Sequence, residues 1–292
     1  MDGILLINKP KDMTSHDVVN IARKSLGTKK IGHTGTLDPD ATGVLVLVVG
    51  KATKLVKYFS NDKKTYQCKF LIGKAYDTDD ITGNIINEED TSSIKLEEVK
   101  DKLYSFLGKQ KQIPPNYSAV KVDGNKLYEL ARKNKMVKNI TPRDVEVFKI
   151  ENVEINREGI NIAVEATMEV SKGTYIRSIA RDLGEKLQNY GCLAELNRIK
   201  VNEIDINDCF TIDQLKSGVY SLKDPFELLN LPSIKVDSYI ESLINNGRYL
   251  DVELFKNKED TIICGKDNTP LAIYYFDETK NVMRMSVKWI WE

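Results

Sequence analysis

Strand-like runs and amphipathic helical segments follow one another in this chain without the regular strand-helix-strand alternation that produces a parallel sheet. The strand-like runs are rich in β-branched residues or alternate in polarity, and they lie at 3–8, 44–49, 65–72, 145–153 and 160–170. Helical spacing of apolar residues occupies 18–26, 96–107 and 174–187. The pattern predicts an α+β fold built on a central, mostly antiparallel sheet.

The end of the chain carries strand signals of its own. A length of 292 residues suits one large domain or two unequal ones. Leu231-Pro232 precedes two short strand-like runs at 261–264 and 271–276. We therefore expect a large domain over residues 1–231 and a small β-rich domain over residues 232–292.

Basic side chains concentrate in the first half of the chain. Residues 1–140 carry 24 basic and 17 acidic side chains, whereas residues 141–292 carry 19 and 26. The densest stretch, 109–138, has eight Lys or Arg against Asp123 and Glu129. Such a distribution favours a basic face for a polyanionic partner, although a solvated helix face explains the stretch equally well.

Cysteine usage and the N-terminus limit the class of protein. The four cysteines are scattered without a CxxC or Cys/His pairing, which indicates neither a zinc site nor a disulfide framework. The N-terminus lacks the charged and apolar regions of a signal peptide, and no apolar stretch reaches the length of a membrane span. These features predict a cytoplasmic protein with no metal and no membrane partner.

The most informative segment, IGHTGTLDPDATGVL, occupies residues 31–45. Its glycines allow a tight backbone path, and its threonines can bond to neighbouring backbone groups. Pro39 restricts Asp38 to an extended conformation, so the Asp38 carboxylate is aimed in one direction. A lone aspartate in a turn is most often a turn-former, and a catalytic carboxylate is the alternative.

Two other motifs can be read near this segment. Gly50-Lys51 is not a phosphate-binding P-loop, because Leu45 and Ala52 replace the required Gly and Ser/Thr. Gly32-His-Thr-Gly35 has the GXXG pattern of a KH domain, which is a weak signal at four residues.

The sequence resembles the bacterial tRNA pseudouridine synthase B family, which isomerises the uridine at position 55 in the T-loop of transfer RNA. GHTGTLDPDATGVL matches the nucleophile motif of that family nearly throughout. Asp12 stands where the family usually has glycine, Asp40 replaces a common leucine and Val46 a common proline. Four further segments match in order: INKPKDMTS at 7–15, KKTYQCKFLIGKAYDTDDITG at 63–83, IPPNYSAVKVDGNKLYELAR at 113–132 and SKGTYIRSIARDLGEKL at 171–187.

The resemblance implies a pseudouridine-synthase-like catalytic domain that works without a cofactor, and it assigns three catalytic residues. Asp38 is the catalytic carboxylate, and Arg177 is the arginine that pairs with it. A nearby cation keeps a partly buried carboxylate ionised. Tyr66 is the tyrosine that stacks on the target base. Without the resemblance, Arg177 reads as a surface residue early on a helix and Tyr66 as a core residue of a strand.

Other residues are implied to bind the substrate, which is the T-arm stem-loop of transfer RNA. Tyr175 and Leu196 resemble the polar wall and the apolar floor of the pocket. His33 resembles the histidine that takes part in RNA recognition, with a structural loop histidine as the alternative. Lys9, in the first matching segment, is also expected to contact substrate.

The basic stretch resembles the flexible insertion that clamps the T-arm. Lys121, Lys126 and Arg132 would bind phosphates there by charge rather than by sequence. The tail from residue 232 occupies the place of an RNA-binding, PUA-like module, and a scaffolding role is the alternative. We expect the protein to act as a monomer.

The sequence also contains an acidic loop. Asp77, Asp79 and Asp80 do not follow a calcium-loop pattern and are expected to fix their loop.

Three other functions are the alternatives to a transfer RNA synthase. They are an RNA chaperone without chemistry, a synthase acting on ribosomal or messenger RNA, and a glycoside hydrolase. The hydrolase is disfavoured because no second acid accompanies Asp38.

Overall fold

The computed structural model describes residues 1–59, 63–118, 120–122, 124–131, 137 and 140–289. Within these residues, nine strands form one large sheet in the order β1-β3-β12-β4-β11-β10-β7, with β2 added to β3 and β13 to β12. All its pairs are antiparallel except β12 with β3. The predicted α+β class with a mostly antiparallel sheet is confirmed. The bounds are β1 (Gly3–Lys9), β2 (Ile31–His33), β3 (Thr42–Val49), β4 (Lys64–Ile72), β7 (Gly108–Gln112), β10 (Arg143–Glu158), β11 (Asn161–Val170), β12 (Gly191–Val201) and β13 (Ile204–Asp205).

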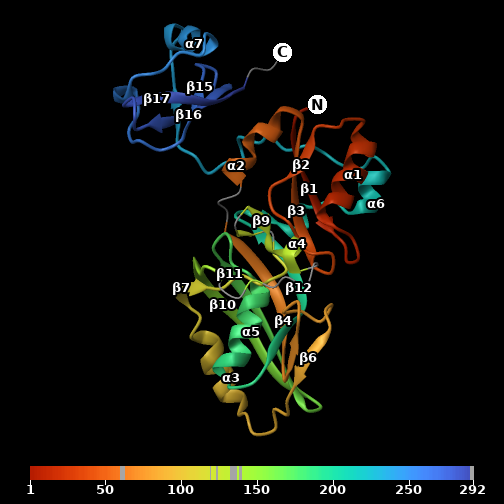
Figure 1. The fold of residues 1–292 in the computed structure, drawn as a ribbon. Coiled ribbons are helices and arrows are strands. Elements are labelled where there is room, and N and C mark those ends of the chain that lie inside the picture. The colour runs from red at the N-terminus through yellow and green to blue at the C-terminus, as the bar shows by residue number, and fades with distance from the viewer. Residues whose placement is uncertain (60–62, 119, 123, 132–136, 138–139, 290–292) are drawn as a thin grey trace.

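One face of this sheet is covered by α5 (Ile176–Lys186) and α3 (Leu96–Tyr104), which lie in front of the strands in Figure 1. Alternate residues of β4 and β11 point to this face and join the apolar side of α5 in one hydrophobic core. The opposite end of the sheet carries α1 (Ser15–Leu26) and α6 (Ile212–Lys216), which pack on a second core beneath β1 and β3.

The start of α1 shows how the sequence sets an element boundary. Thr14 is the N-cap residue and forms a capping box with Asp17, and Gly27 ends the helix in the left-handed conformation. Asp12, just before this helix, has a φ of 62°. The family that the sequence resembles usually has glycine there, because the turn needs a positive φ, which aspartate tolerates better than most residues.

The sequence reading missed β12, which is the strand that joins the two halves of the sheet. It pairs with β3 on one side and β4 on the other. Its first residue, Gly191, lies so close to α5 that a Cβ there would collide with the carbonyl oxygen of Ala180, and a Cβ on Gly184 would collide with Gly191. This close approach fixes α5 against β12 and so places the start of α5 beside the sheet.

The segment between β7 and β10 is called the projection below. It contains the hairpin of β8 (Lys121–Val122) with β9 (Asn125–Lys126), followed by α4 (Leu127–Ala131). A second short hairpin, β5 (Lys74–Tyr76) with β6 (Ile85–Glu88), follows β4. Two short helical segments, η1 (Gly50–Leu55) and α2 (Val56–Phe59), follow β3, and η2 (Ile206–Asp208) follows β13.

A separate four-stranded sheet forms the C-terminal part, at the upper left of Figure 1. It comprises β14 (Ser233–Lys235), β15 (Thr261–Cys264), β16 (Pro270–Asp277) and β17 (Val282–Lys288), with α7 (Ser238–Asn245) and η3 (Val252–Leu254). Because this sheet begins at Ser233, we propose the boundary between residues 231 and 232. One core cluster nevertheless includes side chains of both parts, and Phe226 meets Trp289 edge-on at 5.1 Å.

No helix in the described part of the chain combines the length and hydrophobicity that crossing a membrane requires.

Candidate active site

Asp38 lies in the loop between β2 and β3, with its side chain 49% exposed. The loop closes on itself through a bond from the Ala41 amide to the Asp38 carbonyl, 3.1 Å. The neighbouring Leu37 is buried in the main hydrophobic core together with Tyr66. The buried leucine therefore fixes the backbone, while the adjacent carboxylate reaches solvent.

Two side chains from the β1–α1 region hold this loop in place. The buried Ser15 hydroxyl accepts from the Leu37 amide at 2.9 Å and donates to the Leu37 carbonyl at 3.0 Å. The Lys9 amine donates to the carbonyl of Pro39 at 2.9 Å, and also to those of Pro10 and Met13. Residues on both sides of Asp38 are thus fixed by groups that lie far away in the sequence.

The structure gives no support to the prediction that Lys9 contacts substrate. Lys9 has no exposed surface, and its three donors are used by three carbonyl oxygens. Burial lowers the pKa of Lys9 to about 8, while Asp40 and Asp38 oppose the shift, so the amine keeps its proton at neutral pH. Lys9 is a structural residue of the loop.

A Lys9→Met substitution should lower the free energy of unfolding by about 2–3 kcal/mol, because three carbonyl groups lose a charged donor. Urea denaturation of the two proteins measures this difference. Lys11→Met is the matched control, since the Lys11 side chain is 58% exposed and its ion pair with Asp40 is long, at 3.9 Å. Equal losses in both variants would contradict the structural role of Lys9.

Arg177 lies in the first turn of α5 and is only 7% exposed. One terminal nitrogen, Nη2, contacts Asp38 Oδ2 at 3.1 Å and donates to the Tyr117 carbonyl at 3.0 Å. The other, Nη1, donates to the Thr78 carbonyl at 3.0 Å and contacts Asp80 Oδ2 at 3.3 Å. The guanidinium therefore lies between two carboxylates and joins three loops, which its planar, forked geometry suits.

Asp80 contacts Arg177 of the site, which its sequence pattern did not predict. Its Oδ1 accepts from Thr78 and Thr82 within the loop, as a loop-fixing residue would, but its Oδ2 also faces Arg177. The side chain is 15% exposed. Its neighbour Asp79 pairs with Arg181 at 2.9 Å, and burial raises the pKa of Asp79 while Arg181 opposes the rise. Sequence alone offered no signal that this loop meets α5.

Tyr66 lies on β4, directly between Met168 of β11 and Arg198 of β12 in the sheet. It is 7% exposed and belongs to the same core as Leu37. Tyr66 therefore belongs to the core in which Leu37, the neighbour of Asp38, is buried. Its stacking on a base stays a prediction.

Arg198 is a site residue that the sequence reading missed. It is 1% exposed, and its guanidinium donates to the carbonyls of Val44 at 2.8 Å and Gly35 at 3.1 Å. It thereby fixes the other side of the loop. His33 ends β2 close by; burial, and then the charge of Arg198, lower the pKa of His33, so the imidazole is neutral at pH 7. The role of His33 in RNA recognition stays a prediction.

Tyr175 and Leu196, the predicted wall and floor of the pocket, lie on different elements. Tyr175 is the N-cap residue of α5, where its backbone exchanges two hydrogen bonds with the Gln112 side chain. Leu196 lies on β12 and borders a polar groove of about 820 Å³. The residues lining this groove include Asp40 and Lys69 but not Asp38, Tyr66 or Arg177. We therefore place the candidate site at the ion pair rather than in this groove.

The three predicted phosphate-binding residues fall in the projection between β7 and β10. Lys121 is exposed on β8. Lys126 belongs to β9, but its side chain is outside the described part of the structure, and Arg132 lies outside the described residues altogether. Their contacts with RNA stay predictions.

The chain is similar to known proteins over most of its length. A family described as TruB family pseudouridylate synthase (N terminal domain) matches residues 23–176. A relative named tRNA pseudouridine synthase B from Onion yellows phytoplasma is 39% identical over 277 residues, covering 95% of both chains. One of the same name from Acholeplasma laidlawii is 40% identical over 278 residues, covering 95% of this chain and 96% of the relative.

Among solved structures, a chain of a Cbf5-Nop10-Gar1 complex superimposes with a TM-score of 0.69. The match covers 98% of this chain and 84% of that chain, at 22% sequence identity. At that identity the likeness shows the fold alone.

Proposed function

We infer, from the premise that this chain belongs to the TruB family of pseudouridylate synthases, that it isomerises uridine to pseudouridine in transfer RNA. We further propose that its target is the uridine at position 55, in the T-loop. The sequence segments that resemble the tRNA pseudouridine synthase B family support this target. The proposal keeps the cytoplasm as the location and a monomer as the working form.

The observation that carries the proposal is the ion pair between Asp38 and Arg177. The reaction breaks the bond between base and ribose, turns the base over and rejoins it through carbon, so it needs a charged nucleophile or charge stabiliser in a fixed position. Asp38 is half exposed and can meet a nucleotide, while the buried Arg177 holds its carboxylate in one orientation through the 3.1 Å ion pair. A target base in a loop is also cheaper to extrude than a paired one.

The test is release of tritium from uridine C5 in a T-arm transcript, because isomerisation frees that hydrogen. The wild-type protein should release the label from the target uridine and release none from a transcript with cytidine at that position. Release that persists in the cytidine transcript would move the target elsewhere in the RNA. RNA binding without any release would favour the chaperone.

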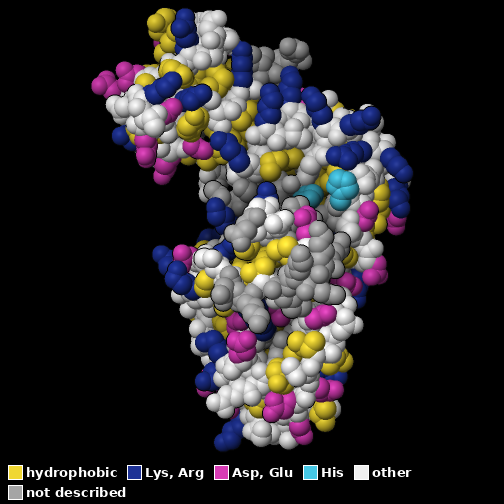
Figure 2. Space-filling view, viewed as in Figure 1, with side chains coloured by type: hydrophobic (Ala, Val, Ile, Leu, Met, Phe, Trp, Pro, Cys, Tyr) yellow, Lys and Arg dark blue, Asp and Glu magenta, His cyan; other side chains and the backbone are white. Residues whose placement is uncertain are grey.

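Surface charge supports a polyanionic substrate. No acidic residue occurs between Asp40 and Asp62, and Lys and Arg side chains gather over β2, η1 and α2 in the upper part of Figure 2. Lys30, Lys54 and Lys57 are exposed there. Such a surface binds phosphates by charge, so affinity for RNA should fall with added salt.

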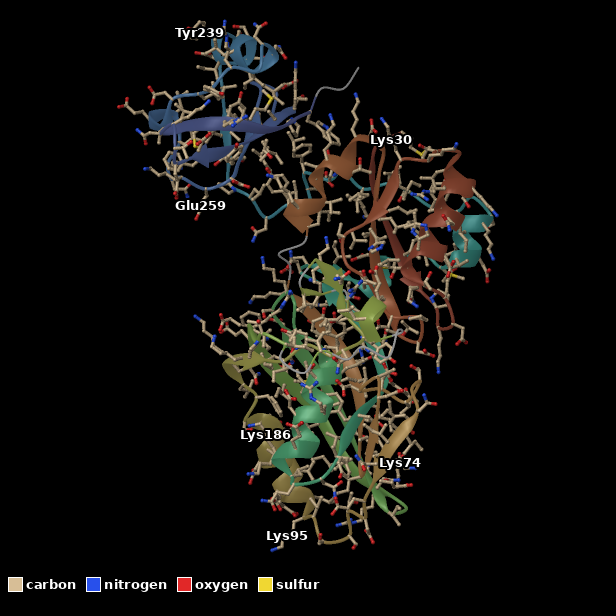
Figure 3. All side chains as sticks on the ribbon, in the orientation of Figure 1. Lys30, Lys74, Lys95, Lys186, Tyr239 and Glu259 are labelled. Carbon is tan, nitrogen blue, oxygen red and sulfur yellow. The ribbon has the colours of Figure 1, made fainter. Side chains whose placement is uncertain are left out.

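Replacing Lys54 by Gln should weaken T-arm binding and reduce the slope of log affinity against log salt by about 1, as expected for one lost phosphate contact. Filter binding over a range of salt concentrations measures the slope. Lys95→Gln is the control, because Lys95 is exposed at the end of the molecule farthest from the C-terminal sheet (Figure 3). An unchanged slope for Lys54→Gln would place the phosphate contacts elsewhere.

A further inference from the structure

The segment that begins the projection, residues 113–118, is tied to the first turns of α5. The Ile113 carbonyl accepts from the Ser178 hydroxyl at 2.9 Å and from Arg181 at 3.0 Å. Gln112, just before this segment, holds the backbone of Tyr175. The Tyr117 carbonyl accepts from Arg177 at 3.0 Å. The segment is therefore held at the N-terminal end of α5.

The last of these bonds brings the segment to the catalytic ion pair. The Tyr117 carbonyl and the Asp38 carboxylate contact the same nitrogen of Arg177, Nη2. Ser118 follows Tyr117, and consecutive Cα atoms lie only about 3.8 Å apart. Ser118 thus directly follows the residue whose carbonyl shares Arg177 Nη2 with the Asp38 carboxylate.

Ser118 has an unusual environment for a serine. It is 4% exposed, yet its hydroxyl finds no hydrogen-bond partner within the part of the chain that the structure describes. The Asn116 side-chain oxygen, two residues earlier, is also buried without a partner among the described residues. Buried polar atoms are nearly always paired, and those that are not call for an explanation such as a missing ligand. Here two of them flank the carbonyl that contacts Arg177.

We propose that the Ser118 hydroxyl hydrogen-bonds the target nucleotide when RNA occupies the Asp38 site. The inference rests on the proposed function, since it names a residue that holds the same substrate. A hydroxyl can both donate and accept, so it can pair with the polar edge of uracil or with a ribose hydroxyl. In the free protein this hydroxyl carries a desolvation penalty that a bound nucleotide removes.

The proposed role predicts that Ser118→Ala changes activity and stability in different ways. Removing an unpaired buried hydroxyl should leave the urea midpoint of the free protein unchanged or raise it, whereas removing a contact to substrate should lower kcat/KM for the T-arm transcript about tenfold or more. The matched control is Ser178→Ala. Ser178 is also buried, but its hydroxyl donates to the Ile113 carbonyl, so its loss should lower the midpoint.

The urea midpoint and kcat/KM of Ser118→Ala together test the proposal. A fall in kcat/KM with an unchanged or higher midpoint supports the proposal. Unchanged kcat/KM, or a midpoint that falls as it does for Ser178→Ala, overturns it, because the hydroxyl then has either no role in binding or a partner within the protein. If the wild type released no tritium, the proposed function would fail instead, and a tenfold difference in affinity for the transcript would test Ser118 alone.

Discussion

An Asp38→Asn protein should release tritium from the T-arm transcript at least about 10³-fold more slowly than the wild type, while binding the RNA with similar affinity. The amide has nearly the shape of the carboxylate, so the loop held by Ser15, Lys9 and Arg198 should persist. What is lost is the negative charge that can attack or stabilise the reacting nucleotide. Single-turnover tritium release with excess protein measures the chemical step separately from product release.

Asp40→Asn is the control for this variant. Asp40 lies two residues further along the same loop, and its ion pair with Lys11 is long and exposed. Such a pair contributes little, so the rate should stay within about threefold of the wild type. Comparable losses in both variants would mean that the loop as a whole, rather than the Asp38 carboxylate, limits the reaction.

Substitution of Arg177 should affect both activity and stability. In Arg177→Met, Asp80 loses its cation in a poorly exposed position, and three loops lose their common donor. We expect the free energy of unfolding to fall by about 3 kcal/mol. This figure is at the low end for a buried ion pair, because Asp38 is half exposed and solvent screens its charge. The rate of isomerisation should fall at least about 10²-fold. Urea denaturation and single-turnover kinetics measure the two effects.

Arg177→Lys separates charge from geometry. Lysine keeps the positive charge, but its compact ammonium cannot span the carboxylates of Asp38 and Asp80 together with two carbonyl groups. The variant should therefore recover part of the stability lost in Arg177→Met and little of the rate. A lysine variant as active as the wild type would show that Arg177 acts by charge alone.

The sequence determined the local structure where short-range chemistry decides it. The run at 44–49 and the alternation at 65–72 became β3 and β4 because β-branched and alternating side chains fit a buried, pleated surface. α1 begins after Thr14 and ends at Gly27, because a capping side chain and a left-handed residue affect only the few backbone groups next to them. The motif around Asp38 likewise marked the candidate site loop, and the resemblance it carries predicted Arg177 as the partner of Asp38, which the ion pair between them matches.

Other features depended on contacts between distant parts of the chain. β12 was missed because its sequence mixes polar and apolar residues, and its place is fixed by β3, β4 and the close packing of Gly191 on α5. Lys9 was predicted to contact RNA, but in the fold it is buried and donates to three carbonyl groups.

The sequence by itself thus determined the fold class and the family, and it singled out Asp38 as the proposed catalytic carboxylate. Only the tertiary structure decided what surrounds that carboxylate: Arg198 and Lys9 behind the loop, and Asp80 and Tyr117 on the far side of Arg177. The physical reason is the range of the forces involved. Helix caps, strand alternation and turns act over a few residues, whereas a buried guanidinium binds whichever carbonyls and carboxylates the complete fold brings within about 3 Å.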